Sequence, residues 1–363
     1  MKIALITELY PLTEDAVFPQ SATFAIHNFC KEWVKYEGVE LDVYAINTYP
    51  NKRRIIPVRK KYIRDGVEIT PVPIFKIPKT ELFFTDYSLS TKEYDVAIGH
   101  SLISLSFLER INASKRFFAF HLSDVNFLQG YSTKKRLAYI ERFKRLTLIS
   151  RSFGIQKDLN ALGLKSEFIA ISGIPAKEIV CRKFAIQDHI NFIVVARLED
   201  YKNIDLVIRS LAKIRNQNWS FSIIGDGVLR GELENLCQEL GISNKVRFLG
   251  VLNHQEVMKQ LMSSDIFVMV SNETFGLVYL EAMAKGNIVI GAKGFGIDGV
   301  VSNGVNGFLV SSSDERELVK LLEYNLGNLQ QLEKVQNQSM KDVSSFTEER
   351  VAKKYFDFIC GEV

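Results

Sequence analysis

The stretch IFVMVSNETFGLVYLEAMAKGNIVIG, residues 266–291, decides the fold, because it combines a strand, a loop, a helix and a second strand in direct succession. The β-branched run IFVMV is followed by a turn around Gly276, by the helical segment LVYLEAMAKG and by the apolar run NIVIG. Strands that alternate with helices in this way form parallel sheets. The stretch therefore predicts a doubly wound α/β domain.

The same alternation occurs in two series along the chain. The first series contains KIALITEL, LDVYAINT, GVEITPVPIF, YDVAIGHS, RFFAFHLS, LTLIS and SEFIAIS, and the second contains INFIVVARL, WSFSIIGDG, VRFLGVL, IFVMVSNE, NIVIGAK and GFLVSSS. A chain of 363 residues also exceeds the size at which one core usually divides, about 250–300 residues. We therefore predict two Rossmann-like domains, residues 1–175 and 176–345, with the linker within residues 175–189. A last helix at 346–363, with Thr347 as its N-cap, can pack back on either domain, including the N-terminal one.

Composition is typical of a soluble globular enzyme, with 47% hydrophobic and 24% charged residues. The net charge of +4 is too small to indicate a nucleic-acid-binding protein. Four cysteines lack metal-like spacing, so buried free thiols are expected. No apolar run reaches the roughly 18 residues of a membrane span, and the N-terminal MKIALITELYP resembles a strand more than a signal peptide. We expect a cytoplasmic protein.

Two acids flank the turn in the opening stretch, Glu273 on the loop and Glu281 inside the helix. Amides at the helix start lack intrahelical acceptors and can hold a phosphate, and Gly276 permits close approach of the backbone. Glu281 lies roughly one turn deeper, where its carboxylate could accept two hydroxyl hydrogen bonds from a ribose. The alternative is that Glu273 only favours the helix start and that Glu281 is a solvated surface residue.

Two cations follow the strand INFIVVARL, Arg197 at its end and Lys202 five residues later. Two positive donors beside a helix N-terminus would neutralise a diphosphate and stabilise a departing phosphate. The alternative is a surface ion pair of Arg197 with Glu199 or Asp200, next to a solvated lysine. Gly225-Asp226-Gly227 follows a third strand of the same sheet, although such a sequence is also an ordinary turn.

Four motifs of the second half resemble those of the retaining glycosyltransferases of family 4. They are V-A-R-L-x-x-x-K-N, I-I-G-D-G-V-L-R-G-E-L-E, E-T-F-G-L-V-Y-L-E-A-M-A-K-G and N-G-V-N-G-F-L-V. The resemblance implies a GT-B fold, in which two Rossmann-like domains face an interdomain cleft. It implies that Glu273 contacts the donor sugar and Glu281 the ribose, and that Arg197 and Lys202 bind the diphosphate. The further donor-binding positions are Gly225, Asp226, Val251, Phe275, Gly276 and Leu277, with Val251 bordering the base.

The first domain matches the family less closely. The segment TEDAVFPQSATFAIHNF, residues 13–29, replaces the usual Gly-Gly loop, so Ser21 and Thr23 are expected to contact the donor phosphate or the acceptor. His121 and His100 end two strands and would lie at the ligand edge of the first sheet. The resemblance places His121 by the donor sugar, and we interpret His100 as a boundary residue. His27, His189 and His254 are assigned to structure.

The resemblance implies catalysis by Glu273, His121, Arg197 and Lys202, without a metal or another cofactor. The predicted function is retaining transfer of a hexose or N-acetylhexosamine from a nucleotide sugar, UDP rather than GDP, to a glycan or lipid-linked acceptor in cell-surface polysaccharide or glycoconjugate synthesis. The alternatives are a nucleotide-sugar epimerase or a phosphorylase on the same fold, and a non-catalytic nucleotide-sugar or glycan-binding module.

Basic residues cluster in two segments of the first domain, residues 52–64 and 134–145. Solvated faces are the common explanation for such runs. The alternative is attraction to an anionic membrane surface, worth about 1 kcal/mol per basic residue, which would place the protein peripherally on the inner face of the cell membrane. Leu137, Ile140, Phe143 and Leu146 share one side of the second segment and could equally be core.

Overall fold

The computed structural model describes residues 1–8, 10–11, 21–48, 60–76, 83–84, 92–186, 189–215 and 218–362. The chain forms two compact units. Unit 1 consists of Met1–Arg151, Ile155–Ser172 and Glu348–Val363, and unit 2 of Ser152–Gly154 and Gly173–Thr347. The chain thus enters unit 2 at Gly173, two residues before the linker expected at 175–189, and returns to unit 1 with its last helix.

Unit 1 contains a mostly parallel sheet with the strand order β3-β4-β2-β1-β6-β7-β8-β9, and β5 pairs with β4. Its strands are β1 (Lys2–Glu8), β2 (Glu40–Thr48), β3 (Tyr62–Arg64), β4 (Val67–Lys76), β5 (Phe83–Phe84), β6 (Tyr94–His100), β7 (Ala113–Phe120), β8 (Thr147–Ser150) and β9 (Phe168–Ile169). Only β3 and β5 run antiparallel to their neighbour β4. These short edge strands are the part of the sheet that the β-branched runs did not predict.

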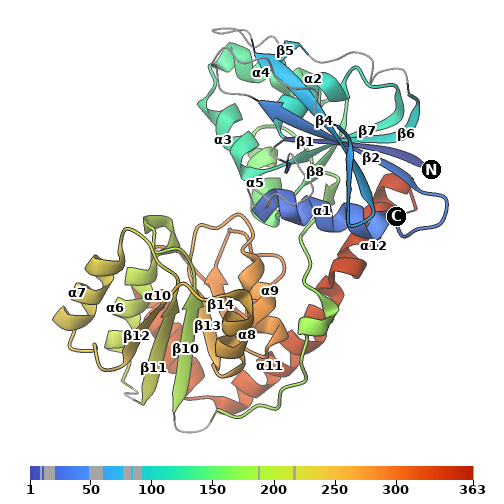
Figure 1. Cartoon of the computed structure of the whole chain (residues 1–363). Coiled ribbons are helices and arrows are strands. Elements are labelled where there is room, and N and C mark those ends of the chain that lie inside the picture. Colours follow the sequence, from blue (N-terminus) through green and yellow to red (C-terminus); the bar gives the residue numbers. More distant parts are fainter. Residues whose placement is uncertain are drawn as a thin grey trace. The chain divides into compact units, whose positions relative to one another are not determined.

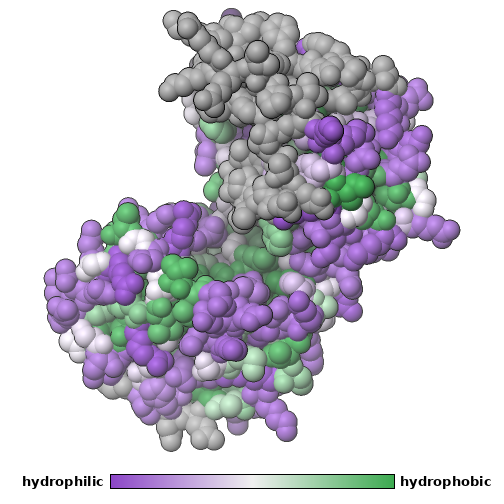
Figure 2. All heavy atoms as spheres, viewed as in Figure 1, coloured by the Kyte–Doolittle hydropathy of each residue, from purple (hydrophilic) through white to green (hydrophobic). Residues whose placement is uncertain are grey.

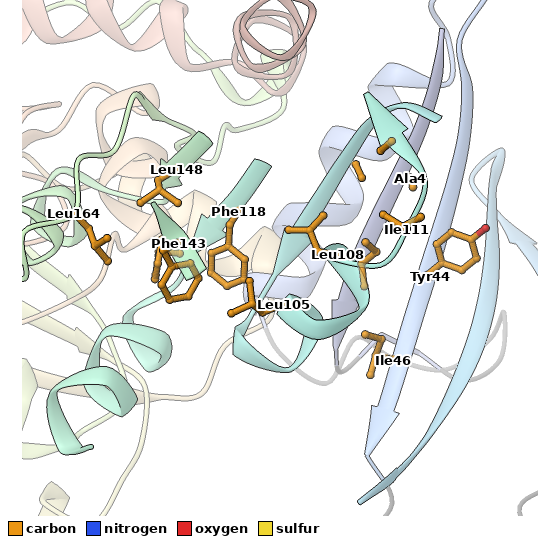
Figure 3. Close-up of a cluster of buried hydrophobic side chains, with 14 of the residues drawn as sticks. Ala4, Tyr44, Ile46, Leu105, Leu108, Ile111, Phe118, Phe143, Leu148 and Leu164 are labelled. Atoms are coloured by element: carbon orange, nitrogen blue, oxygen red, sulfur yellow. The ribbon is translucent and has the colours of Figure 1, made fainter. Parts of the chain in front are cut away.

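The helices of unit 1 flank the sheet (Figure 1), and all of them except α12, the last element of the chain, lie between strands of unit 1 in the sequence. They are α1 (Ser21–Trp33), η2 (Leu102–Ser104), α2 (Leu105–Leu108), α3 (Leu122–Gly130), α4 (Thr133–Phe143), α5 (Phe153–Ala161) and α12 (Glu348–Cys360). The core on one face includes Phe118 and Phe143, which Figure 3 labels, and also Phe120. The ring centroids of these three residues lie 4.7–4.8 Å apart. Fully burying a phenylalanine stabilises the fold by about 1.5–3 kcal/mol, so this cluster is a main source of stability for unit 1.

The last helix, α12, packs on α1 although about 300 residues separate them (Figure 1). The indole Nε1 of Trp33 donates to the carbonyl of Ala352 at 3.0 Å, and the ring of Tyr355 lies 5.1 Å from that of Trp33. Trp33 and Tyr355 are fully buried. The C-terminal helix is therefore an integral part of unit 1.

Unit 2 contains a parallel sheet with the order β12-β11-β10-β13-β14-β15, which is the 3-2-1-4-5-6 order of a doubly wound fold. Its strands are β10 (Ile190–Val195), β11 (Trp219–Ile224), β12 (Val246–Gly250), β13 (Ile266–Met269), β14 (Ile288–Ala292) and β15 (Phe308–Val310). Every residue of β13 and β14 is buried, as expected for apolar strands covered on both faces.

Two groups of helices, α6, α7 and α10, and α8, α9 and α11, flank this sheet on opposite sides in Figure 1. The helical segments of unit 2 are η3 (Ala176–Glu178), η4 (Asp200–Lys202), α6 (Ile204–Lys213), α7 (Arg230–Glu239), α8 (His254–Met262), α9 (Leu277–Ala284), α10 (Glu315–Leu326), α11 (Leu329–Val343) and η5 (Ser344–Phe346). The strand order reverses between β10 and β13 in unit 2 and between β1 and β6 in unit 1. Ligands of such folds bind at the carboxyl ends of the strands beside these switch points.

Several surface and thiol expectations need correction. All four cysteines are free, but Cys181 is exposed and Cys360 half-buried, so only Cys30 and Cys237 are the buried thiols that were expected. Leu137 is 54% exposed, so it is not core, whereas Ile140 and Phe143 on the same helix are buried. On the face shown in Figure 2, hydrophilic side chains cover most of unit 2. None of the helices in the described ranges is both long and apolar enough to span a bilayer.

Candidate active site

The switch point of unit 2 brings the predicted cations and the first predicted acid together. β10 leads into Arg197 and η4, and β13 leads into the loop that carries Glu273. The ammonium of Lys202 contacts the carboxylate of Glu273. Two segments 71 residues apart thus place opposite charges at one edge of the sheet.

Lys202 is buried, with 8% of its surface exposed, and is not the solvated lysine of the alternative interpretation. Burial lowers the pKa of Lys202 from its ordinary value of 10.5 to about 8, and the positive charge of Arg197 lowers it further, while Glu199 opposes the shift. Perturbed titration at a strand-end site is typical of functional residues. A lysine that begins to lose its charge just above neutral pH is unusual for a purely structural ion pair.

Arg197 has the surroundings that the alternative interpretation predicted. Its side chain is 71% exposed, lies 3.0 Å from the carboxylate of Glu199, and donates to the hydroxyl of Tyr201 at 3.0 Å. Exposed ion pairs of this kind contribute about 0–1 kcal/mol. The guanidinium can therefore exchange Glu199 for an anionic ligand at little cost.

Asn203, for which no functional role was predicted, stabilises the loops that carry Lys202 and Glu273. It has a left-handed backbone, with φ 50°, and its amide donates to the carbonyls of Val270, at 2.7 Å, and Ser312, at 3.1 Å. Asn is one of the few residues that tolerate this conformation, so the Asn that directly follows Lys202 in the sequence is consistent with a turn at this position. A further bond, from the amide of Asn272 to the carbonyl of Tyr201 at 3.0 Å, joins the same loops.

Helix α9 starts at Leu277, with Gly276 as its N-cap in a left-handed conformation, φ 74°. A Cβ at Gly276 would lie 2.8 Å from the ring of Tyr279, whose hydroxyl is bonded to the carbonyl of Met269. The first amides of the helix have no intrahelical acceptor and stand next to the loop of Glu273. Phe275 is buried, whereas Gly276 and Leu277 are half-buried.

The Gly294–Gly296 segment packs directly on this loop. The amide of Gly296 donates to the carbonyl of Glu273 at 2.8 Å, and a Cβ at Gly296 would lie 2.3 Å from Cα of Phe275. Only glycine fits there. The Gly294–Gly296 segment thus supports the loop of Glu273.

Glu281 is half-buried, with its side chain 17% exposed, so the solvated alternative is wrong for this residue. Burial raises its pKa, and the negative charge of Glu178 adds to the increase, while His254 and Lys285 oppose it. Nδ1 of His254 lies 3.8 Å from the Glu281 carboxylate. His254, which the sequence assigned to structure, therefore lies beside a predicted ribose-binding residue.

Gly225 and Asp226 support the Arg197 loop from the neighbouring strand. A Cβ at Gly225 would lie 1.9 Å from the carbonyl oxygen of Ala196, and the carbonyl of Asp226 accepts from the amide of Leu198 at 3.0 Å. The Asp226 carboxylate accepts from the amide of Gly227 at 2.8 Å. The Gly-Asp-Gly turn thus lets two strand ends approach closely.

Val251, the predicted neighbour of the base, follows β12 and is 79% exposed. Residues 251 and 281 both belong to unit 2, together with the other predicted donor-binding residues.

The predicted residues of unit 1 are differently placed. Ser21 is the first residue of α1, and its side chain lies outside the described part of the structure. Thr23 is buried, with 3% of its surface exposed, which places its hydroxyl inside unit 1. Most of the loop that precedes them, residues 12–20, also lies outside the described residues.

His121 follows β7 directly and is the N-cap of α3. Its Nε2 lies 3.1 Å from Nδ1 of His100, the last residue of β6, which is fully buried. Burial lowers the pKa of His121 to about 3, and the positive charge of Arg151 lowers it further. The interpretation of His100 as a simple boundary residue missed this contact.

Among the described residues, no group of three or more His, Cys, Asp and Glu side chains is arranged to hold a metal ion. The expectation of metal-independent chemistry stays a prediction.

Comparisons with known proteins agree with this geometry. Residues 177–342 match the profile of the family described as Glycosyl transferases group 1. An uncharacterized glycosyltransferase, MJ1607, of Methanocaldococcus jannaschii is 33% identical over 177 residues, which are 48% of this chain and 45% of that protein. The matched region thus covers less than half the length of this curated relative.

Solved structures resemble the whole chain. The lipopolysaccharide outer core galactosyltransferase WaaB superposes with a TM-score of 0.75 at 16% identity, covering 100% of both chains. Anabaena Alr3699/HepE, solved in complex with UDP, superposes with a TM-score of 0.72 at 16% identity, covering 99% of this chain and 100% of that one. Identities this low establish the fold alone. The chain therefore has the GT-B fold, and its residues 177–342 form a domain of the group 1 glycosyltransferase family.

Proposed function

We propose that this chain is a retaining glycosyltransferase that moves a hexose or N-acetylhexosamine from a nucleotide sugar to a glycan or lipid-linked acceptor, in cell-surface polysaccharide or glycoconjugate synthesis. The observation that carries the proposal is the buried Lys202 in contact with Glu273, beside the start of α9. A cation and unpaired helix amides beside one switch point suit a diphosphate, and a loop carboxylate suits sugar hydroxyls. The complex of HepE with UDP favours UDP over GDP as the donor nucleotide.

In the proposed reaction, the bond between the anomeric carbon and the phosphate oxygen breaks, and its electron pair stays on the phosphate. Arg197, Lys202 and the α9 amides stabilise the charge that develops on this oxygen. The acceptor hydroxyl attacks the anomeric carbon from the face that the phosphate leaves, and its proton passes to the departing phosphate. Because these groups replace a metal as the source of positive charge, transfer should continue in a chelator.

A donor panel tests this function. UDP-, GDP- and ADP-sugars are compared for thermal stabilisation and for release of nucleoside diphosphate, with and without acceptor glycans. We expect UDP-sugars to stabilise the protein and turnover to require an acceptor. Turnover of the donor sugar without an acceptor would instead indicate an epimerase, and binding without turnover would indicate a binding module.

Glu273→Ala provides the site test. The variant should retain the fold, because Glu273 lies on a partly exposed loop, and should lose at least about a hundredfold in transfer, as removal of one stabilising group does in other active sites. Glu234→Ala is the matched control, since Glu234 lies on α7 and, among the described residues, forms an ion pair with the half-buried Arg230 at 3.0 Å. Normal transfer by Glu273→Ala would refute its assigned role.

We also propose that unit 1 associates with anionic lipid on the inner face of the cell membrane. Among the described residues, α4 combines Lys134, Lys135 and Arg136 with the exposed Leu137, and α3 exposes Phe127, which is 58% accessible. Most of the other basic segment, residues 52–59, lies outside the described part of the chain. Vesicles with and without anionic lipid test the association, and Leu137→Glu should weaken it. Equal sedimentation with neutral vesicles would argue against it.

A further inference from the structure

The carboxyl edge of the unit 1 sheet contains a pair of histidines that the proposed function uses only in part. β6 and β7 are parallel neighbours in which His100 pairs with Ala119, so His121 lies two residues beyond this register position. Nδ1 of His100 and Nε2 of His121 are 3.1 Å apart, and the ring centroids are 5.4 Å apart. Since two N–H groups cannot face each other in a hydrogen bond, one of these nitrogens must carry a proton and the other must not.

The position of Asp124 indicates which of these two nitrogens carries the proton. The first turn of α3 forms a capping box in which the carboxylate of Asp124 accepts from the amide of His121 at 2.9 Å, and the imidazole of His121 faces the amide of Asp124. With Nε2 directed to His100, the nitrogen that faces this amide is Nδ1. The amide N–H of Asp124, which donates to the backbone carbonyl of His121 at 3.1 Å, also faces Nδ1 in the capping box, so a second N–H at Nδ1 is disfavoured. This arrangement favours the tautomer in which His121 carries its proton on Nε2 and donates it to His100.

His100 is then protonated on Nε2. This atom is buried and has no hydrogen-bond partner among the described residues. A second bond from Asp124, accepted from the amide of Leu102 at 2.9 Å, joins the segment after β6 to the start of α3. The relative position of the two imidazoles is therefore fixed through the backbone as well as through their own contact.

The charges around the pair keep both rings neutral. Burial lowers the pKa of His100 as well as that of His121, and the positive charge of Arg151, which follows β8, acts in the same direction on both. The carboxylate of Asp124 is bonded to backbone amides, and burial raises its pKa to about 7. Glu8, at the end of β1, also has a pKa raised by burial. No carboxylate is bonded to either imidazole among the described residues.

We propose that His100 is a positioning residue for His121, accepting its Nε2 proton and so fixing one neutral tautomer and one ring orientation at this edge of the sheet. The inference rests on the proposed glycosyl transfer for its kinetic consequence, but not for the tautomer. His121 in this state presents a fixed neutral imidazole and cannot accept a proton at Nε2.

Nuclear magnetic resonance tests the tautomer without any substrate. The chain has five histidines, so labelling them with ¹⁵N gives few signals, and a His121→Gln sample identifies that of His121. Long-range ¹H–¹⁵N spectra are expected to show His121 protonated on Nε2 alone, unchanged from pH 8 to pH 5.5. Protonation on Nδ1, or charging of His121 within this range, would overturn the proposal.

Two substitutions test the positioning role. His100→Phe removes the acceptor, whereas His100→Gln offers a carbonyl in its place. We expect His100→Phe to lower kcat about tenfold, the effect of one hydrogen bond, with KM for the donor little changed, and His100→Gln to restore part of the loss. The exposed His189 provides the control, and His189→Gln should leave kcat unchanged.

The outcomes separate the two hypotheses. If wild-type protein transfers no sugar from any donor, the proposed function fails, while the spectra of wild-type and His100→Gln protein still decide the tautomer. If His100→Phe does not fold, the spectra of wild-type and His100→Gln protein still establish the tautomer of His121. An unchanged His121 signal in His100→Gln and His100→Phe, together with unchanged kcat, would show that His100 does not position His121.

Discussion

Raising the pH from 7 to 9 is expected to weaken the binding of a nucleoside diphosphate, because the ammonium of Lys202 provides buried positive charge at the proposed phosphate site. The pKa of this lysine is about 8 in the folded protein. About nine-tenths of the lysine is then charged at pH 7 and about one-tenth at pH 9, so the affinity should fall about tenfold over this range.

The same shift has a defined sign for stability. The pKa is lowered from 10.5 on folding, so between about pH 8 and 10.5 the folded protein holds fewer protons than the unfolded chain. The free energy of unfolding should rise with pH in that window. Binding and stability therefore change in opposite directions as Lys202 loses its proton.

Calorimetric titration with UDP at half-unit steps between pH 7 and 9.5 measures the binding effect. Lys202→Arg is the control, because its guanidinium stays charged throughout, and any remaining slope then belongs to the ligand or to other groups. A dissociation constant for the wild-type protein that stays level from pH 7 to 9, or that follows the same slope in Lys202→Arg, would refute the role of Lys202.

Three further substitutions probe the ribose site, the loop support and the core. Glu281→Ala should raise the dissociation constant of UDP about 150-fold, because it removes two hydroxyl bonds to a carboxylate worth about 1.5 kcal/mol each, while inhibition by pyrophosphate, which has no ribose, stays the same. An equal loss for pyrophosphate would contradict the ribose assignment. Gly296→Ala places a Cβ 2.3 Å from Cα of Phe275 and should cost about 1–3 kcal/mol of stability, measured by urea unfolding, together with donor affinity. Unchanged donor affinity in Gly296→Ala would mean that the loop of Glu273 tolerates the displacement that the added Cβ causes. Trp33→Ala should destabilise unit 1 by about 3–5 kcal/mol in calorimetry, because it removes a fully buried indole bonded to Ala352, and UDP should still stabilise unit 2. A single transition that shifts equally with and without UDP would contradict this separation.

The regular part of the fold was predictable because it depends on local patterns. Apolar runs such as IFVMV and NIVIG can be satisfied only in strands covered on both faces, and their alternation with helices gives parallel order. The antiparallel strands β3 and β5 were not predicted, because two or three residues carry too little periodicity. The start of α12 after Thr347 followed from capping, but the helix's packing on α1 depends on side chains about 300 residues away.

The site was predictable in its residue types but not in its electrostatics. Nothing in LEDYKNID shows that Lys202 is buried while Arg197, five residues earlier, is exposed, because that difference arises from the η4 turn and from Asn203. The contact between His100 and His121 depends on the register of β6 with β7, which no local pattern contains. Thr23 appeared accessible from its position near a helix start, yet it is buried.

The two switch points differ in charge in a way that suits the proposed chemistry. At the edge of unit 2, Arg197 and Lys202 provide positive charge, which a departing diphosphate requires. At the edge of unit 1, burial keeps His121 uncharged and raises the pKa of Asp124 to about 7. A protonated imidazole beside a sugar that develops positive charge would oppose ionisation, whereas the neutral imidazole of His121 adds no such penalty. Because Arg151 helps to keep His121 neutral, replacing Arg151 with methionine should raise the pKa of that imidazole, and a pKa that does not rise would mean that burial alone maintains the neutral state.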